Sequence, residues 1–166
     1  NKIFFGYYAG DFDKYAKDSK RIGKLRKEYG ISDDVFLIGT VSYFYKPKYH
    51  MLQFKGLKGH EDFIDAFSIL RKKYKNVKGI IIGGPAPGAE NYEKRIIERA
   101  RRKCGTDIIF TGFRNDILEI YPDLDLVVHP SRSENYGGCG ESLSMAVPTL
   151  TSNVGGFPDF IKEKKT

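Results

Sequence analysis

The sequence predicts an α/β fold in which a doubly wound parallel sheet is covered by helices on both faces. Short apolar runs alternate with helix-period segments along the 166 residues, and glycine or proline breakers separate them. Continuous apolar runs are typical of parallel strands that are buried on both faces. With 40% hydrophobic residues the chain can form one ordinary core, so we expect residues 1–166 to be a single domain.

The first half of the chain supplies three expected strands and two expected helices. Apolar and β-branched runs predict strands, and apolar residues spaced three or four apart predict helices, as Phe63, Phe67 and Leu70 show. A loop without clear period is expected at 46–57. The expected elements are a strand within 1–13, a helix at 15–29, a strand at 35–44, a helix at 59–74 and a strand at 77–82.

The second half continues the alternation. The helix expected at 91–103 begins with acidic and ends with basic residues, which complements its dipole. The chain stops where a further strand would follow, so we expect an excised domain or a truncated chain. The remaining expected elements are strands at 107–111, 124–129 and 148–152, and helices at 115–121, 140–146 and 157–163.

The net charge of +7 comes mostly from basic clusters at 14–27, 71–78 and 94–103. Each cluster overlaps an expected helix, so we interpret them as solvated outer faces and expect no nucleic-acid partner. Attraction of these helices to anionic lipid, and so peripheral membrane association, stays open. Cys104 and Cys139 fit neither a metal site nor a disulfide framework, and no apolar run approaches the roughly 18 residues of a membrane span. We expect a cytoplasmic protein.

Residues 130–158 hold the densest group of functional candidates. Glu134 and Glu141 flank a turn with Gly137, Gly138 and Gly140, between an apolar strand and a helical run. The first N–H groups of a helix lack internal partners, so such a turn can bind an anion such as phosphate. Carboxylates accept hydrogen bonds from hydroxyls. Phosphate plus hydroxyls predicts a sugar nucleotide as the ligand.

Other patterns exclude competing classes of site. The glycine pair Gly83-Gly84 lacks the GxGxxG fingerprint, which disfavours a hydride-transfer enzyme. The segments 11–13 and 123–125 have the DxD spacing of a cation site, but they fit a turn and the start of a strand better. His60 and His129 fit a helix start and a strand end better than a general base. We therefore expect neither a metal ion nor another cofactor.

Several strings resemble, in the same order, the C-terminal donor-binding half of a retaining GT-B glycosyltransferase. They run from residue 35 to 161 and include KGLKGHEDFIDAF, IIFTGF, DLVVHPSRSENYGGCGESL and PTLTSNVGGFPDFI. This family builds bacterial polysaccharides, lipopolysaccharide and glycolipids. The resemblance implies a Rossmann-like domain that is one half of a GT-B fold, with the N-terminal acceptor domain and the extreme C-terminus absent.

The resemblance also implies roles for individual residues. Lys58 matches the lysine that contacts the donor diphosphate, with Gly59 beside it, and Glu134 matches the glutamate that holds the donor sugar hydroxyls. Glu141 matches the glutamate that binds the ribose. Asn135 and Tyr136 complete the turn after Glu134. Further donor contacts, largely through backbone groups, are implied for Gly137, Gly138, Cys139, Phe113 and Arg114.

Two features depart from the family pattern. The family usually has one residue more between its two glutamates than the six that separate Glu134 from Glu141, which places a deletion within 138–140. An arginine of the family that pairs with the diphosphate is replaced by Tyr43. Lys46, Lys48 and Lys55 are candidate substitutes, with Lys48 and Lys55 favoured, although a lysine is a point charge and not a bidentate fork.

The resemblance implies transfer of a sugar, with retention, from a UDP- or GDP-sugar to a glycan or lipid-linked acceptor. Lys58 and a helix N-terminus would stabilise the departing diphosphate without a metal. Two alternatives stay open: a sugar-nucleotide epimerase of similar architecture, and a non-catalytic nucleotide-binding or interaction module. Because the acceptor site needs the missing half, we expect this chain alone to be inactive.

Overall fold

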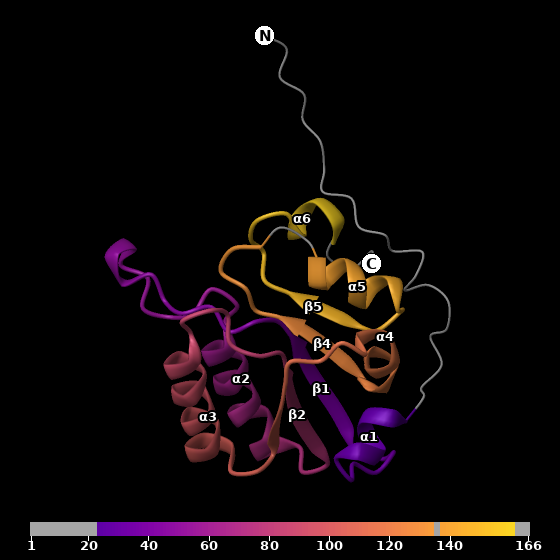
Figure 1. Ribbon diagram of the computed structural model, residues 1–166. Coiled ribbons are helices and arrows are strands. Elements are labelled where there is room, and N and C mark those ends of the chain that lie inside the picture. Colours follow the sequence, from indigo (N-terminus) through magenta and orange to yellow (C-terminus); the bar gives the residue numbers. More distant parts are fainter. Residues whose placement is uncertain (1–22, 135–136, 162–166) are drawn as a thin grey trace, which may run out of the picture.

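The computed structural model describes residues 23–134 and 137–161, and its centre is a five-stranded parallel sheet (Figure 1). The strands lie in the order β3-β2-β1-β4-β5, and every pair of neighbours is parallel. The predicted doubly wound sheet is therefore confirmed. The strands are β1 (Phe36–Val41), β2 (Val77–Ile82), β3 (Ile108–Gly112), β4 (Leu126–His129) and β5 (Thr149–Thr151).

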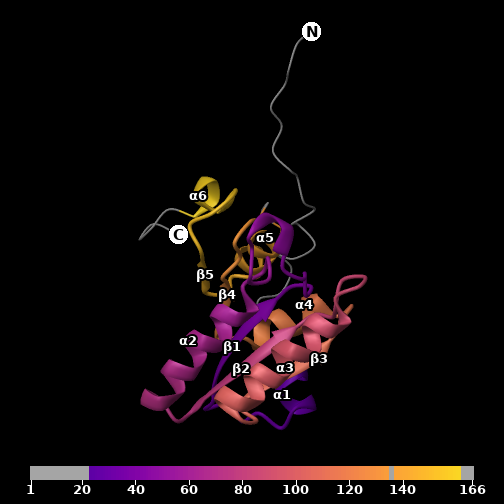
Figure 2. The same ribbon diagram turned by 90° about the vertical axis from the view of Figure 1, so that its left-hand side faces the viewer.

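Helices cover both faces of this sheet, with α2 and α3 on one side and α1, α4 and α5 on the other (Figures 1 and 2). There are also two short 3₁₀ turns, η1 between β1 and α2 and η2 directly after α4. The helical elements are α1 (Lys24–Glu28), η1 (Tyr49–Met51), α2 (His60–Lys73), α3 (Glu90–Cys104), α4 (Ile117–Ile120), η2 (Tyr121–Asp123), α5 (Gly137–Ser144) and α6 (Phe157–Phe160).

Two hydrophobic cores explain why the strands are apolar at nearly every position. Successive side chains of a strand point to opposite faces. In β2, Ile81 packs with Phe63 of α2 and Ile96 of α3, whereas its neighbours Ile80 and Ile82 belong to the core on the other face. A strand that is buried on both faces needs apolar residues at successive positions and not only at every second one, as predicted from the continuous apolar runs.

Several boundaries differ from the predicted ones. The strand expected at 35–44 ends at Val41, and beyond it Phe44 forms only an isolated bridge with Pro85. The helix expected at 140–146 begins three residues earlier, at Gly137, so that the glycines lie in its first turn. The strand expected within 1–13 lies outside the described residues, as do residues 15–22 of the helix expected at 15–29. Within the described part of that expected helix, α1 spans Lys24–Glu28.

The DxD segment at 123–125 fastens α1 to the start of β4. Asp123 is fully buried, and its carboxylate accepts hydrogen bonds from the backbone N–H groups of Gly23 (2.6 Å) and Leu25 (2.7 Å). Asp125 accepts the N–H of Leu37 and forms an ion pair at 2.6 Å with the buried guanidinium of Arg26. Both carboxylates thus serve the fold, in keeping with their interpretation as the start of a strand.

Candidate functional site

A cavity of about 560 Å³ opens at the carboxyl ends of β1 and β4. These two strands are neighbours at the point where the strand order reverses, because the chain runs outward from β1 to β3 and then returns to β4. In doubly wound sheets ligands bind in the crevice at this reversal. Most of the site residues predicted from the sequence line the cavity: Lys58, Phe113, Arg114, Glu134, Gly137, Gly138 and Glu141.

Lys58 and Glu134, which the sequence analysis assigned to catalysis, meet in this cavity. The ammonium group of Lys58 forms an ion pair with the carboxylate of Glu134, across 76 residues of sequence. The hydroxyl of Ser131 donates a second hydrogen bond to that carboxylate, at 3.1 Å. Only 17% of the lysine side chain and 13% of the glutamate side chain is exposed. A cation and an anion are thus held together, partly shielded from water, at the wall of the cavity.

Gly59 allows the loops that carry these two residues to approach each other. Its φ of 70° lies in the left-handed region, and a Cβ at this position would lie 2.0 Å from the carbonyl oxygen of Pro130. Only glycine fits such a contact without a shift of the backbone. Next to it, the N–H of Arg132 donates to the carbonyl of Leu57 at 2.8 Å. The loop before α2 is thereby fixed against the loop after β4.

The first turn of α5 forms a second wall of the cavity. Its leading N–H groups begin at Gly137 and have no partner within the helix, which is the arrangement that suits an anion. Gly138 packs close to the ring of His129, where an added Cβ would lie 3.1 Å from Cε1. Glu141 lines the cavity one turn later and accepts a hydrogen bond from the hydroxyl of Tyr121 at 3.3 Å.

Three further predicted residues cannot be placed as ligands through their side chains. Asn135 and Tyr136 lie outside the described residues. Cys139 is fully buried, is not among the described residues that line the cavity, and burial raises the pKa of its thiol to about 11. The role predicted for Cys139 is one of its backbone N–H in the first turn of α5, which the thiol's position leaves unaffected.

Phe113 and Arg114 line the cavity in different ways. The Phe113 ring is 65% exposed and stacks on Tyr43, with ring centroids 6.1 Å apart and planes inclined by 28°. Arg114 forms ion pairs with Glu28 (2.6 Å) and Asp116 (2.7 Å), and the hydrogen bonds to these carboxylates raise the pKa of its guanidinium. Tyr43 and Phe113 therefore offer an aromatic surface, whereas the charge of Arg114 is engaged with protein carboxylates.

The lysines expected to replace the family's arginine lie elsewhere. Among the described residues, the cavity lining includes Tyr43 and Lys58 but neither Lys48 nor Lys55. Lys55 instead forms an ion pair with Asp62 at 2.5 Å, and Lys48 is the exposed residue before η1. The geometry thus gives no support to these two as diphosphate ligands. The backbone of 46–57 carries both lysines away from the cavity. This path could not be predicted, because the sequence of the segment has no periodic pattern.

Two buried histidines support the cavity. Burial lowers the pKa of His129, which lines it, to about 4, and that of His60 to about 3, so both rings are neutral near pH 7. His60 Nε2 lies 3.1 Å from the hydroxyl of Ser42, another lining residue, and the His60 ring stacks on Phe44 at 4.2 Å. Structural roles were predicted for both histidines from the sequence. Ser42 and Ser131 were not predicted, because single serines in loops carry no pattern.

The fold and site define the class of protein: a doubly wound α/β domain with a charged, glycine-lined cavity at its strand-order reversal. Residues 49–166 match the family described as "Glycosyl transferases group 1". The chain belongs to this family. It has the fold of the C-terminal domains of GT-B glycosyltransferases, as the resemblance had implied.

Curated relatives and solved structures agree with this assignment. The capsular polysaccharide biosynthesis glycosyltransferase CapM of Staphylococcus aureus is 24% identical over 98% of this chain and 39% of its own length. The lipopolysaccharide core biosynthesis mannosyltransferase LpsB of Rhizobium meliloti is 33% identical over 50% of this chain and 24% of its own length. Among solved structures, HepE of Anabaena, in complex with UDP and glucose, superposes with a TM-score of 0.75 at 23% identity, over 97% of this chain and 40% of that one. The chain thus spans about two fifths of CapM and of HepE.

Proposed function

We propose that this chain is the donor-binding domain of a retaining glycosyltransferase that uses a nucleoside diphosphate sugar. The observation that carries the proposal is the Lys58–Glu134 pair, which shares one cavity with the first turn of α5 and with Glu141. Anion-binding and hydroxyl-binding groups are thereby grouped as a sugar nucleotide requires. The UDP and glucose bound to HepE further support a donor of this class.

Each part of the donor has a matching wall in the cavity. The diphosphate lies against the N–H groups at 137–139 and near the Lys58 ammonium, since both favour negative charge. The ribose hydroxyls donate to Glu141. The base lies against the Tyr43–Phe113 surface, and the transferred sugar donates hydroxyl hydrogen bonds to Glu134. Lys58 then exchanges part of its contact with Glu134 for the incoming diphosphate.

The chemistry in this proposal is electrostatic. The acceptor hydroxyl attacks from the face that the nucleotide leaves, through an oxocarbenium-like transition state, and negative charge grows on the departing diphosphate. Lys58 and the α5 N-terminus lie where that charge develops, which is the contribution usually worth most in enzymes. Glu134 holds the sugar during transfer. In this mechanism no metal ion is required.

The acceptor in this proposal is a glycan or a lipid-linked sugar, bound by a further domain in the cytoplasm. CapM and LpsB are named for capsular polysaccharide and lipopolysaccharide core biosynthesis, which supports an acceptor of this kind. Because this chain covers 39% of CapM, we expect it to bind the donor but not to transfer sugar alone. A C-terminal domain of a related Francisella tularensis protein has been crystallised by itself, so a domain of this type can be studied in isolation.

Calorimetric titration with UDP, GDP, UDP-glucose, UDP-N-acetylglucosamine and GDP-mannose tests the proposal. We expect saturable binding of one nucleotide class, weakened about tenfold or more in Lys58→Ala and in Glu141→Ala, because each loses a charged hydrogen bond. Lys75→Ala, at an exposed site near the C-terminal end of α2, is the matched control. Binding that is equally strong in Lys58→Ala, Glu141→Ala and the control would contradict the assignment of the site.

A further inference from the structure

The segment 45–55 between β1 and α2 carries exposed apolar side chains away from both cores. Figure 1 shows η1 projecting from the body of the molecule on the side of α2 and α3. Leu52 is 79% exposed, Phe54 70% and Tyr49 51%, and the rings of Tyr49 and Phe54 lie 6.4 Å apart. Three apolar side chains gathered on a projecting tip are costly in water, which marks such a surface for contact with another apolar medium.

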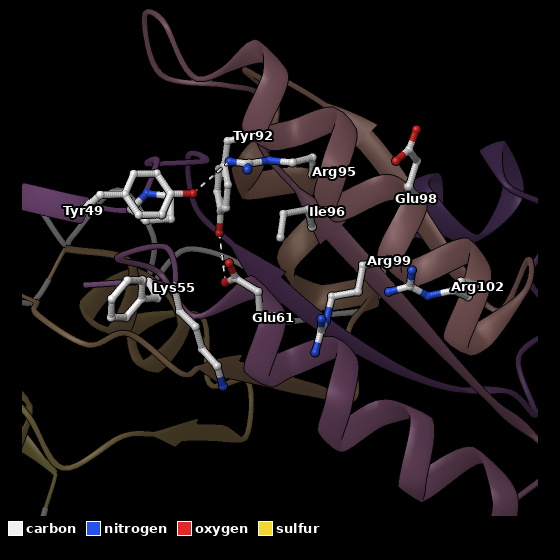
Figure 3. A pocket seen from close by; sticks show the side chains of 11 residues that line it. Tyr49, Lys55, Glu61, Tyr92, Arg95, Ile96, Glu98, Arg99 and Arg102 are labelled. Atoms are coloured by element: carbon white, nitrogen blue, oxygen red, sulfur yellow. Dashed lines mark hydrogen bonds between the residues drawn. The ribbon is translucent and has the colours of Figure 1, made fainter. Parts of the chain in front are cut away.

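The same segment is strongly basic. Residues 45–55 include Lys46, Lys48 and Lys55 but no aspartate or glutamate. A second cavity, of about 370 Å³, lies between this segment and α3 (Figure 3). Its lining includes four basic side chains: Lys55 and Arg99, which form ion pairs with Asp62 and Asp65, and Arg95 and Arg102. The apolar tip therefore stands beside the positive charges of Arg95 and Arg102.

The acidic residues of this second cavity do not cancel that charge. Glu61 is buried in its floor, where it accepts hydrogen bonds from the N–H of Gly56 (3.2 Å) and the hydroxyl of Tyr92 (2.9 Å). Glu98 points away from the other side chains (Figure 3). On the rim, Arg95 donates to the hydroxyl of Tyr49 at 3.3 Å, which links the guanidinium to the aromatic tip.

We propose that residues 45–55 and the adjoining face of α3 form a docking surface for an anionic membrane. Leu52, Phe54 and Tyr49 enter the boundary between headgroups and acyl chains, and Arg95 and Arg102 receive a lipid phosphate beside them. Cations alone would equally suit a free anion in solution. The exposed tip favours the membrane over a free anion, because a bilayer interface offers the apolar side chains and the cations partners together.

This surface differs from the one that the sequence analysis left open, which consisted of the basic helices alone. It also lies next to the donor cavity: the Lys58 ammonium is 6.0 Å from the centre of the Tyr45 ring, where the segment begins. Docking would therefore bring the donor cavity close to the lipid surface. That consequence, unlike the docking itself, depends on the proposed function, in which the acceptor is a glycan or lipid-linked sugar.

Vesicle flotation tests the docking surface. The chain is mixed with phosphatidylcholine vesicles, or with vesicles that also contain about 30 mol% phosphatidylglycerol, at low and at physiological salt. We expect binding to the anionic vesicles that weakens with salt and little binding to the neutral ones. Absence of binding to the anionic vesicles at low salt, or equal binding to both compositions, would overturn the proposal.

Paired variants locate the surface. We expect Leu52→Ser with Phe54→Ser to weaken vesicle binding about tenfold or more, because the inserted apolar area is lost. Arg95→Glu with Arg102→Glu should weaken it as strongly, through charge. The controls are Ile69→Ser with Leu150→Ser, at exposed sites elsewhere, and Lys72→Glu with Lys75→Glu, at the other end of α2. The assignment would be overturned if the control variants lost vesicle binding to the same extent. It would also be overturned if inorganic phosphate, at the same concentration as the anionic lipid, abolished vesicle binding.

The docking surface and the donor site can be tested independently of each other. Titration of the Leu52→Ser, Phe54→Ser chain with the nucleotide panel should give the affinity of the unsubstituted chain, since neither residue lines the donor cavity. In the unsubstituted chain, absence of nucleotide binding together with binding to anionic vesicles would count against the proposed function alone. Nucleotide binding without binding to anionic vesicles would count against the docking surface alone.

Discussion

Gly59 shows how a single residue holds the site together. It starts α2 with a left-handed φ and lies against the Pro130 carbonyl, so the loops of Lys58 and Glu134 can meet. The sequence indicated a glycine in the KG string but gave no reason for it beyond the start of a helix. The reason is a contact between two loops more than 70 residues apart, and a linear pattern carries no information about such an approach.

Gly59→Ala should therefore lower the free energy of unfolding by far more than the same substitution at a left-handed glycine with open space around it. We expect a loss of about 3 kcal/mol in the free energy of unfolding, from the strained φ together with the clash at Pro130. Gly30→Ala is the matched control, because Gly30 has a φ of 62° and open space around its Cβ position, and it should lose about 1 kcal/mol. Urea unfolding measures both, and equal losses would show that the loop contact is unimportant.

The buried histidines make the fold sensitive to acid. The pKa of His60 is lowered to about 3 and that of His129 to about 4, from an ordinary value of 6.5. Below pH 6.5 these two histidines bind protons in the unfolded chain, whereas in the folded chain they stay neutral down to about pH 4. Stability is thus present in full above pH 6.5 and falls as the pH drops towards 4, on the order of 1 kcal/mol per pH unit for each histidine.

His60→Phe should reduce this acid sensitivity by about one histidine's share. Phenylalanine keeps the stacking on Phe44 and removes the titrating ring. Urea unfolding at several pH values between 7 and 4 measures the slope, and His50→Phe, at an exposed site, is the control for ring replacement. An unchanged slope in His60→Phe would show that the ring is already protonated in the folded chain or titrates as it does when unfolded.

At the scale of elements, the strands β2, β3 and β5 and the helices α2 and α3 were predictable to within one residue, whereas the start of α5 was not. Strand β2 has the predicted bounds, and α2 and α3 differ by one residue at each end, because a full apolar stripe defines them. The start of α5 was predicted three residues late, since glycines in a helix's first turn look like a turn in sequence. The segment 46–57 was expected as a loop, but its projection and its cavity against α3 depend on tertiary contacts.

A buried hydrogen-bond network around Glu61 links α2, α3 and the end of the segment 45–55. Tyr92→Phe removes a hydroxyl donor from the Glu61 carboxylate, which is 9% exposed, and leaves it the N–H of Gly56. We expect a loss of about 2 kcal/mol in the free energy of unfolding, because a buried carboxylate loses a partner. Tyr74→Phe, at a ring that is 51% exposed, should change it by less than about 0.5 kcal/mol. Similar changes in the two variants would show that the network contributes little.

At the scale of the whole molecule, the alternation of strands and helices predicted the fold class but not the strand order. The order β3-β2-β1-β4-β5 depends on where the chain crosses back, after β3. That crossing creates the reversal between β1 and β4, where the cavity lies. Motif order supplied the site residues, and the topology explains why residues 58, 113, 134 and 141 share one cavity.

Within the described residues, no helix is long and apolar enough to cross a bilayer.

The central claim is that this cavity receives the nucleotide of the donor. The most direct measurement is the mapping of backbone amide chemical shifts by NMR while UDP or GDP is added to the chain. We predict saturable shifts concentrated at residues 42–43, 58–59, 113 and 137–141, with little change along α3. Saturable shifts centred instead on the second cavity, beside Arg95 and Arg102, would contradict the account, as would the absence of any saturable shift with either nucleotide.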